Sequence, residues 1–389
     1  MDRAVYLDYA ASTPLDPRVK RVVSEALDTG GNPSSVHAPG RQARRAVEEA
    51  RQGLADLLGV EASTVVFTSG ATESNNLALS GALRAVLIRK PESRPEPLRV
   101  LTTPLEHPSV RETLQALSAV HDMEIDLLPT DGQGRVRAEA VTEMVTERTF
   151  LVSVMWVNNV LGTVQPVREI ADRLAGLKAS RGRQGLPLLF HCDAVQALRT
   201  EEVHPAESGV DLLSLSAHKI YGPRGVGALY VRREAPLHPL FSGGTQESSL
   251  RAGTENVAGI VGLGSAARLM IEERDRDRRH VRELEGILSA GLRERDLGYR
   301  LACPESPRVP GIAYLAGAEE GDVTALKLDM RGIAVSSGAA CEAGTRKGSG
   351  ALKTLDDRDL ARRGGIRVSF GRFTDRQELE RLLEALAGD

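Results

Sequence analysis

The stretch VDLLSLSAHKIYGPRG, residues 210–225, contains a short apolar run that ends close to a lysine. Residues 210–216 have the composition of a buried β-strand, and Lys219 comes just after that run. A second run of this kind, residues 186–190, is followed by Asp193. Residues at the carboxyl ends of parallel strands gather at one edge of the sheet, so these two runs indicate the fold and the site together.

Similar runs alternate with longer amphipathic segments. We expect strands at residues 65–68, 99–103, 124–128, 150–155, 187–191, 212–215 and 227–231. We expect helices at residues 41–59, 72–89, 109–121, 137–145 and 167–180. This alternation is typical of βαβ units, so it predicts an α/β protein with a mostly parallel seven-stranded sheet, whose binding crevice lies at the carboxyl ends of the strands.

The pattern changes near residue 256. Residues 260–297 have the pattern of one long helix, and the shorter elements that follow end in a helix at residues 375–387. We therefore predict a large α/β domain, residues 16–256, and a smaller α+β domain that consists of residues 257–389 together with residues 1–15.

The composition is that of an ordinary globular protein and argues against several classes of function. The net charge is −3, whereas proteins that bind nucleic acid or a membrane surface carry a basic excess. No apolar run approaches the ~18 residues of a membrane-spanning helix, and the first residues lack the apolar core of a signal peptide. Three cysteines argue against a disulfide framework and for the cytoplasm. The eight histidines show no metal-ligand spacing, so we expect no metal site.

Lys219 and Asp193 together suggest a cofactor. A lysine at the end of a buried strand, near phosphate-binding groups, is what a pyridoxal phosphate enzyme needs for its Schiff base. An aspartate at a neighbouring strand end could pair with the pyridinium nitrogen of that cofactor. Pyridoxal phosphate is therefore the cofactor that we expect.

The segment TSGATESN, residues 68–75, lies between an expected strand and an expected helix. Small residues such as Ala71, the N–H groups at the helix start and the Thr72 hydroxyl could bind a phosphate. Alone, this segment reads better as an ordinary helix cap. With Lys219 and Asp193 at comparable strand ends, phosphate binding becomes the better interpretation, and we expect Ser216 and His218 to complete the phosphate site.

Four further polar residues have both a functional and a plain structural interpretation. His107 could stack on a cofactor ring and give or take a proton, or simply close the loop before a helix. Gln196 could donate to the pyridine 3′-oxygen, or lie on the surface of a helix start. Asn159 could hold a substrate carboxylate, or occupy a left-handed turn. Arg367 could clamp that carboxylate, although an arginine in a strand more often faces solvent.

Cys341 lies in SSGAACEAGT, residues 336–345, a composition typical of a mobile loop. An accessible thiol is a nucleophile in proportion to its thiolate fraction, so a reactive role is the better interpretation. Cys192 lies within a buried-looking segment, where we expect a small apolar side chain, and Cys303 precedes Pro304 in a connector.

In their order along the chain, these motifs resemble the cysteine desulfurases of the NifS/IscS type, within the class-V aminotransferase group of pyridoxal phosphate enzymes. The resemblance runs nearly end to end, and so many specific blocks in one order make chance agreement negligible. The blocks are YLDYAASTP (6–14), GNPSS (31–35), TSGATESNN (68–76), EH (106–107), NN (158–159), HCDAVQ (191–196), SAHK (216–219), RAGTEN (251–256), SSGAAC (336–341) and RVSFGR (367–372).

The resemblance implies a fold type I homodimer that converts L-cysteine to L-alanine. The sulfur would pass, as a persulfide on Cys341 in the smaller domain, to an acceptor protein for iron–sulfur cluster assembly or for thiolation of a cofactor or tRNA. The implied catalytic residues are Lys219, Cys341 and His107. The implied cofactor contacts are Ala71, Thr72, His107, Asp193, Gln196, Ser216, His218 and Lys219, with Thr254 reaching the phosphate in the other subunit. The implied substrate contacts are Asn32, Asn159 and Arg367.

The chain departs from the family pattern in two places. Residues 160–162, Val-Leu-Gly, stand where Glu-Ile-Gly usually follows the asparagine pair, and residues 348–350, Gly-Ser-Gly, stand where a Pro-Ser pair is usual. The second departure bears on loop mobility and on which acceptor docks. Two other functions stay open: a selenocysteine lyase-type enzyme on the same scaffold, or a non-catalytic partner of a sulfur scaffold. The full set of catalytic residues weighs against the latter.

Overall fold

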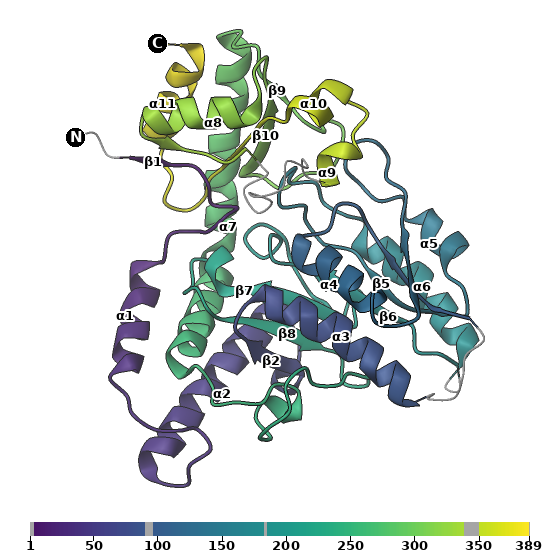
Figure 1. Ribbon diagram of the computed structural model, residues 1–389. Coiled ribbons are helices and arrows are strands. Elements are labelled where there is room, and N and C mark those ends of the chain that lie inside the picture. Colours follow the sequence, from purple (N-terminus) through teal and green to yellow (C-terminus); the bar gives the residue numbers. More distant parts are fainter. Residues whose placement is uncertain (1–3, 90–95, 183–184, 338–349, 389) are drawn as a thin grey trace.

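The central element of the fold is a seven-stranded sheet (Figure 1). The computed structural model describes residues 4–89, 96–182, 185–337 and 350–388. β8 runs antiparallel to both of its neighbours, and the other pairs are parallel, which confirms the predicted mostly parallel sheet. In spatial order the strands are β2 Val65–Thr68, β8 Gly227–Val231, β7 Leu212–Ser216, β6 Leu189–Asp193, β5 Thr149–Ser153, β3 Leu98–Thr102 and β4 Met123–Leu127.

The observed strand ends lie close to the expected ones. β2 and β8 have the expected bounds, whereas β6 is shifted and ends at Asp193 instead of residue 191. Pro187 lacks the N–H that a strand needs for its ladder, which explains the later start of β6. After β5, Val154 N and Trp156 N still donate to backbone oxygens of β6, those of His191 and Asp193. The segment after β5 therefore stays beside the end of β6.

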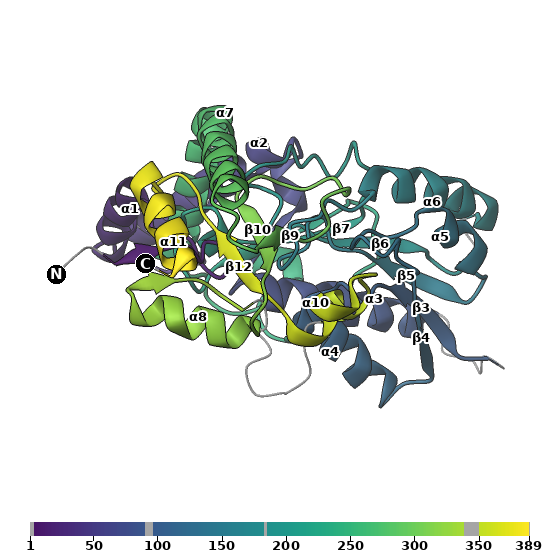
Figure 2. The same cartoon turned by 90° about the horizontal axis from the view of Figure 1, so that it is seen from above.

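Helices cover both faces of this sheet (Figure 2). On one side lie α3 Ala71–Arg89 and α4 Pro108–Ser118. On the other side lie α2 Ala38–Leu58, α5 Glu139–Met144, α6 Val167–Arg181 and α7 Val257–Glu294. All six were expected from the sequence, with bounds that differ by a few residues, as helix ends commonly do.

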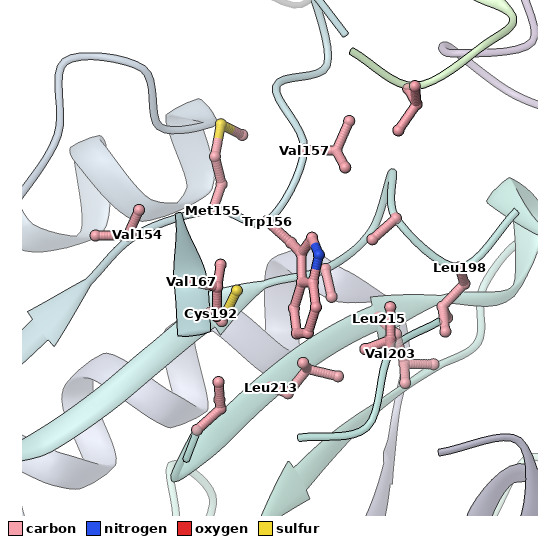
Figure 3. Close-up of a cluster of buried hydrophobic side chains, with 14 of the residues drawn as sticks. Val154, Met155, Trp156, Val157, Val167, Cys192, Leu198, Val203, Leu213 and Leu215 are labelled. Atoms are coloured by element: carbon pink, nitrogen blue, oxygen red, sulfur yellow. The ribbon is translucent and has the colours of Figure 1, made fainter. Parts of the chain in front are cut away.

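Apolar side chains fill the space on each face of the sheet. Every residue of β5, β6 and β7 is buried, as expected for strands covered on both faces. Leu212 packs in the cluster beneath α3, whereas Leu213 packs in the cluster on the opposite face, because successive strand residues alternate. Figure 3 shows part of that second cluster, with Trp156 and Cys192. Burial raises the pKa of the Cys192 thiol well above its usual value, so this residue packs as the small apolar side chain that we expected.

A smaller sheet lies beside the C-terminal half of α7 (Figure 1). Its strands, β9 Arg300–Leu301, β10 Ile312–Ala316 and β12 Ile366–Ser369, are antiparallel, and β1 Val5–Tyr6 pairs in parallel with β11 Ile333–Ala334. These elements share a hydrophobic core of their own, to which the N-terminal Leu7 contributes. The first half of α7, through Ile260 and Met270, still packs in the core of the large sheet, so the two cores meet within α7. The domain boundary at residue 256 stays a prediction.

The remaining helices are short or surround these two sheets. They are α1 Pro17–Leu27, α8 Gly321–Met330, α9 Gly350–Lys353, α10 Arg358–Arg363, α11 Arg376–Ala387 and the 3₁₀ turns η1 Ala62–Thr64, η2 Ala217–Lys219 and η3 Glu247–Ser249. None of the helices in the described part of the chain is both long and apolar enough to cross a membrane.

Arg372 joins the C-terminal part of the chain to α1 and α7. Its guanidinium lies 2.9 Å from the carboxylate of Asp16, which caps α1, and 2.6 Å from that of Asp277 in α7. Burial alone would raise the pKa of Asp16, but hydrogen bonds from Arg18 and Arg372 lower it to about 2. This buried cluster of charges fixes the first helix against the long helix α7.

Gly227 gives the first testable consequence of this packing. A Cβ at this position would lie 2.6 Å from Leu215 O and 2.7 Å from Gly70 Cα, so the start of β8 touches the loop after β2 too closely for a side chain. Gly227→Ala should therefore lower the free energy of unfolding in urea by about 1–3 kcal/mol, as overpacked sites do. The control is Gly176→Ala in α6, where a Cβ meets nothing within 4 Å and should add about 0.5–1 kcal/mol. Equal stability of the two variants would contradict the close packing.

Candidate active site

A cavity of about 440 Å³ lies where the strands of the large sheet end. Its walls come mainly from the segments that follow β2, β3, β5, β6 and β7, with residues of the N-terminal segment and of β12 completing them. The lining residues are Ala10, Ala11, Ser12, Ser69, Gly70, Ala71, Thr72, Glu73, His107, Ser109, Met155, Val157, Asn159, Asp193, Val195, Gln196, Ser216, His218, Lys219, Arg224, Gly225 and Arg367. The site predicted at the carboxyl edge of the sheet is thus a real cavity, and it contains most of the predicted residues.

Lys219 lies in the wall of this cavity, at the end of the 3₁₀ turn that follows β7. Its Nζ donates to the backbone oxygens of Ala10 and Ala11, at 2.5 and 2.8 Å. Carbonyl oxygens compensate an ammonium that has lost part of its water, because their dipoles point negative ends at the charge. The N-terminal segment therefore holds the amine in a defined place.

Asp193 is buried at the end of β6 and has two donors. Oδ1 accepts from Val195 N at 3.0 Å, and Oδ2 accepts from Asn75 Nδ2 at 2.9 Å. Gln196 follows one turn later, and its Nε2 donates to Ala10 O at 2.8 Å. Its Oε1 is buried and has no hydrogen-bond partner within the described protein.

The loop between β2 and α3 forms the second wall. The first N–H groups of a helix have no intrahelical partner, so the start of α3 at Ala71 and Thr72 points donors out of the helix end. A Cβ on Gly70 would meet nothing within 4 Å, so the space in front of this loop is open. Ser216 and His218 line the same cavity. The N–H groups at the start of α3, the helix dipole and the hydroxyls of Thr72 and Ser216 make this part of the cavity suitable for an anion.

His218 is held as a neutral side chain. Its Nδ1 lies 3.2 Å from Ser12 Oγ. Burial, together with the nearby charges of Lys219 and Arg224, lowers the pKa of His218 to about 4. At neutral pH the ring therefore contributes hydrogen bonding and no charge.

His107 caps helix α4 and lines the cavity at the same time. Its Nδ1 accepts from Ser109 N at 3.1 Å and lies 2.8 Å from Ser109 Oγ. The structural interpretation of this residue is confirmed, since it is a helix cap. Its position in the cavity lining is compatible with the functional one, which stays a prediction.

Arg367 is buried, contrary to the usual position of an arginine in a strand. Only 2% of its surface is exposed. Nη2 lies 2.7 Å from Asp8 Oδ1, and Nη1 donates to Asn159 O at 2.8 Å. Its Nε is buried without a hydrogen-bond partner in the described protein. Arg367 and Asn159 are thus neighbours in the cavity wall, as the predicted substrate contacts require.

Three predicted residues are not part of this cavity. Asn32 is exposed between α1 and α2, where its Oδ1 accepts from Ser34 N at 2.9 Å, so it makes no contact with the cavity of its own chain. Thr254 is exposed and also lies outside the lining, and its predicted contact with the other subunit stays a prediction. Cys341 lies outside the described residues.

Glu106 is a buried carboxyl group whose role the sequence did not indicate. It is 2% exposed, and its Oε1 accepts from Met155 N at 2.7 Å and from Thr103 Oγ1 at 3.2 Å. Its Oε2 has no partner, and no ion pair involves this residue among the described parts of the chain. Burial, with a smaller contribution from the charge of Asp193, raises the pKa of Glu106 to about 8, although the hydrogen bonds from Met155 N and Thr103 lower it. Glu106 is thus mostly neutral at pH 7, and it ties the His107 loop to the segment after β5.

The raised pKa of Glu106 gives a test by pH. A group whose pKa is higher in the folded than in the unfolded state stabilises the fold at low pH and loses that contribution as pH rises through the folded value. Glu106→Gln keeps the shape and stays neutral. Relative to this variant, the wild type should therefore lose stability between about pH 4.5 and pH 8, by up to about 1.4 kcal/mol per pH unit.

Thermal unfolding of the cofactor-free proteins across this pH range is the measurement. The control is Glu112→Gln, which changes an exposed glutamate of α4 and should follow the wild type at every pH. A constant difference between wild type and Glu106→Gln would show that Glu106 keeps an ordinary carboxyl pKa.

Comparisons with known proteins agree with this geometry. The profile of the aminotransferase class-V family matches residues 5–382. The cysteine desulfurase IscS of Dictyoglomus turgidum is 38% identical over 388 residues, which cover 99% of this chain and 94% of that protein. A cysteine desulfurase of Cereibacter sphaeroides is 39% identical over 385 residues, with 98% and 94% covered.

Solved structures give the same result. A NifS-like protein superimposes with a TM-score of 0.87 at 33% identity, covering 99% of this chain and 98% of that one. The structure described as SspA in complex with cysteine has a TM-score of 0.77 at 30% identity, with 95% and 99% covered.

Proposed function

The chain belongs to the class-V aminotransferase family, among its cysteine desulfurases, and we propose that it uses pyridoxal phosphate to transfer the sulfur of L-cysteine to Cys341. The observation that carries this proposal is the convergence of an amine, a buried carboxylate and a helix N-terminus on one cavity. L-Alanine is the second product, because the substrate carbon that loses sulfur gains a proton.

The residues present fit pyridoxal phosphate. The start of α3, with Ser216 and His218, suits the phosphate, and the cavity of about 440 Å³ has room for the ring. The buried carboxylate of Asp193 suits the protonated pyridine nitrogen. Gln196 lines the same cavity, and its buried Oε1 has no partner within the described protein, so its amide is the side chain that we assign to a ring substituent. Lys219 supplies the amine that such a cofactor requires.

When bound, the cofactor supplies an electron sink for the carbon next to the amino group of the substrate. Residues of the protein transfer the protons and hold the substrate. Lys219 Nζ is the group that takes and returns the proton of that carbon, because its amine lies in the cavity wall. His107 also lines the cavity and is a second side chain that can carry a proton. Arg367 and Asn159 hold the substrate carboxylate, and the buried Nε of Arg367 is a donor still to be satisfied.

The sulfur acceptor in this proposal is the thiol of Cys341. L-Cysteine and the Cys341 thiol give L-alanine and a Cys341 persulfide, so atoms and electrons balance. The other two thiols suit this step less well. Cys192 is buried in the apolar cluster, and burial raises the pKa of Cys303 to about 12, which leaves almost no thiolate at neutral pH. The persulfide then passes its outer sulfur to an acceptor protein or a small thiol, for iron–sulfur cluster assembly or for thiolation.

We also propose that the enzyme is a homodimer in which Thr254 reaches the phosphate of the partner. Support comes from a second cavity, of about 500 Å³, that Pro33, Ser34, Gln246 and Glu255 line. Pro33 follows Asn32 and Glu255 follows Thr254 in the sequence, so both predicted residues adjoin this second cavity and lie outside the first one. We place the protein in the cytoplasm because Cys192 and Cys303 are free thiols.

The sharpest test of the sulfur acceptor is Cys341→Ser. The variant should keep the visible absorbance of the bound cofactor but lose more than 99% of sulfide and L-alanine production, because a hydroxyl cannot take a sulfur. The matched control is Cys303→Ala, which removes a buried, poorly ionised thiol and should leave turnover within about twofold.

The outcomes also separate the alternatives. Undiminished turnover of L-cysteine by Cys341→Ser would exclude Cys341 as the acceptor. Undiminished turnover of L-selenocysteine by that variant, with slow turnover of L-cysteine by the wild type, would favour a selenocysteine lyase. A wild-type protein that binds no cofactor would favour a non-catalytic partner.

A further inference from the structure

A continuous chain of hydrogen bonds joins Asp193 to His107 through two side chains without an assigned role. Asn75 Nδ2 lies 2.9 Å from Asp193 Oδ2 and 2.8 Å from Ser109 Oγ. Ser109 Oγ in turn lies 2.8 Å from His107 Nδ1. The chain crosses from the end of β6, through α3, to the start of α4.

The direction of each bond follows from groups that can only donate or only accept. The backbone N–H of Ser109 can only donate, and it points at His107 Nδ1 from 3.1 Å. Nδ1 must therefore carry a lone pair and no proton. The Ser109 hydroxyl, at the same nitrogen, then has to donate its proton to Nδ1 as well. A neutral ring of this kind has its proton on Nε2.

The other end of the chain gives the same direction. The Asn75 amide has Nδ2 toward Asp193, because the opposite orientation would place an amide oxygen against a carboxylate oxygen. The second hydrogen of Nδ2 is then donated to Ser109 Oγ. That oxygen accepts from Asn75, so its own hydrogen is left for His107. The Asp193 carboxylate and the Ser109 N–H therefore set the same direction of hydrogen-bond donation, from Asn75 through Ser109 to His107.

Burial makes this arrangement rigid. Asn75 is 0% exposed and Ser109 is partly buried, so water does not compete freely for these bonds. Burying an amide without hydrogen bonds costs free energy. The bonds to Asp193 and Ser109 satisfy Nδ2, whereas Oδ1 is buried without a partner in the described protein. Each side chain in this series of hydrogen bonds thus has one favourable orientation.

We propose that Asn75 and Ser109 are positioning residues that hold His107 as the neutral tautomer with its proton on Nε2. In this form the ring offers a hydrogen-bond donor at Nε2 and is not a base at that atom. The choice between donor and acceptor, which the sequence left open, is thereby made by two residues of α3 and α4. The catalytic consequence rests on the proposed desulfurase function, whereas the tautomer does not.

The tautomer is tested by ¹⁵N NMR of histidine-labelled protein at neutral pH, with and without bound pyridoxal phosphate. The His107 signals are identified by their loss in His107→Gln. In the wild type, Nδ1 should have the shift of an unprotonated nitrogen and Nε2 that of a protonated one. Ser109→Ala and Asn75→Ala should move both shifts toward the average of a mixed population. A wild-type ring that is protonated on Nδ1, or on both nitrogens, overturns the proposal, even if no variant can be purified.

Kinetics of the holoenzyme give a second readout. Because Asn75 and Ser109 act in series on one ring, each single variant should lower kcat about tenfold with KM within twofold, and the double variant should lose little more than either. Losses of kcat that multiply in the double variant, or an unchanged kcat, would overturn the proposal.

The control variants are Asn76→Ala, whose amide donates to Thr72 O within α3, and Ser118→Ala, whose hydroxyl donates to Gln115 O within α4. Both should behave as the wild type. If His107 has the predicted tautomer but the protein has no desulfurase activity, the proposed function is refuted and the tautomer proposal stands.

Discussion

The amine of Lys219, the carboxylate of Asp193 and the segment after β5 meet in one cavity because β5, β6 and β7 pair in parallel, which brings their carboxyl ends to one edge of the sheet. Asp193 lies opposite Ser214 in that register. A slip of one residue would turn the Asp193 side chain to the other face and bury it among apolar side chains. The apolar filling on both faces, in which Leu212 and Leu213 point in opposite directions, makes such a slip costly. The core of the protein thus sets the geometry of its chemistry.

Buried charge is kept low around this edge. Two carboxyl groups, Glu106 and Asp193, lie near each other in the interior, and the raised pKa of Glu106 leaves it mostly neutral at pH 7. His218 is neutral for the opposite reason, since burial lowers its pKa. The amine of Lys219 is compensated by backbone oxygens. Glu106 and His218 thus add little charge beside the carboxylate of Asp193 and the amine of Lys219 at neutral pH.

Much of this could be predicted from the sequence, and the reasons are local. Apolar runs mark strands, so Lys219 and Asp193 could be placed at strand ends and the parallel sheet could be expected. The rest depends on how distant segments meet. The burial of Arg367 follows from its contact with Asp8 across the chain. The link between Asn75 and Ser109 follows from the packing of α3 on α4, which no spacing in the sequence records. The neutral state of Glu106 is likewise a result of burial.

We propose that Lys219, at the end of the turn η2 that follows β7, is the residue that holds pyridoxal phosphate. Reduction of the reconstituted protein with borohydride fixes the cofactor to its lysine, and mass spectrometry of the digested protein then locates the pyridoxyl group. We expect stoichiometric modification of the peptide that contains Lys219. Modification at another of the seven lysines, or no stable modification of protein that is saturated with the cofactor, would contradict it.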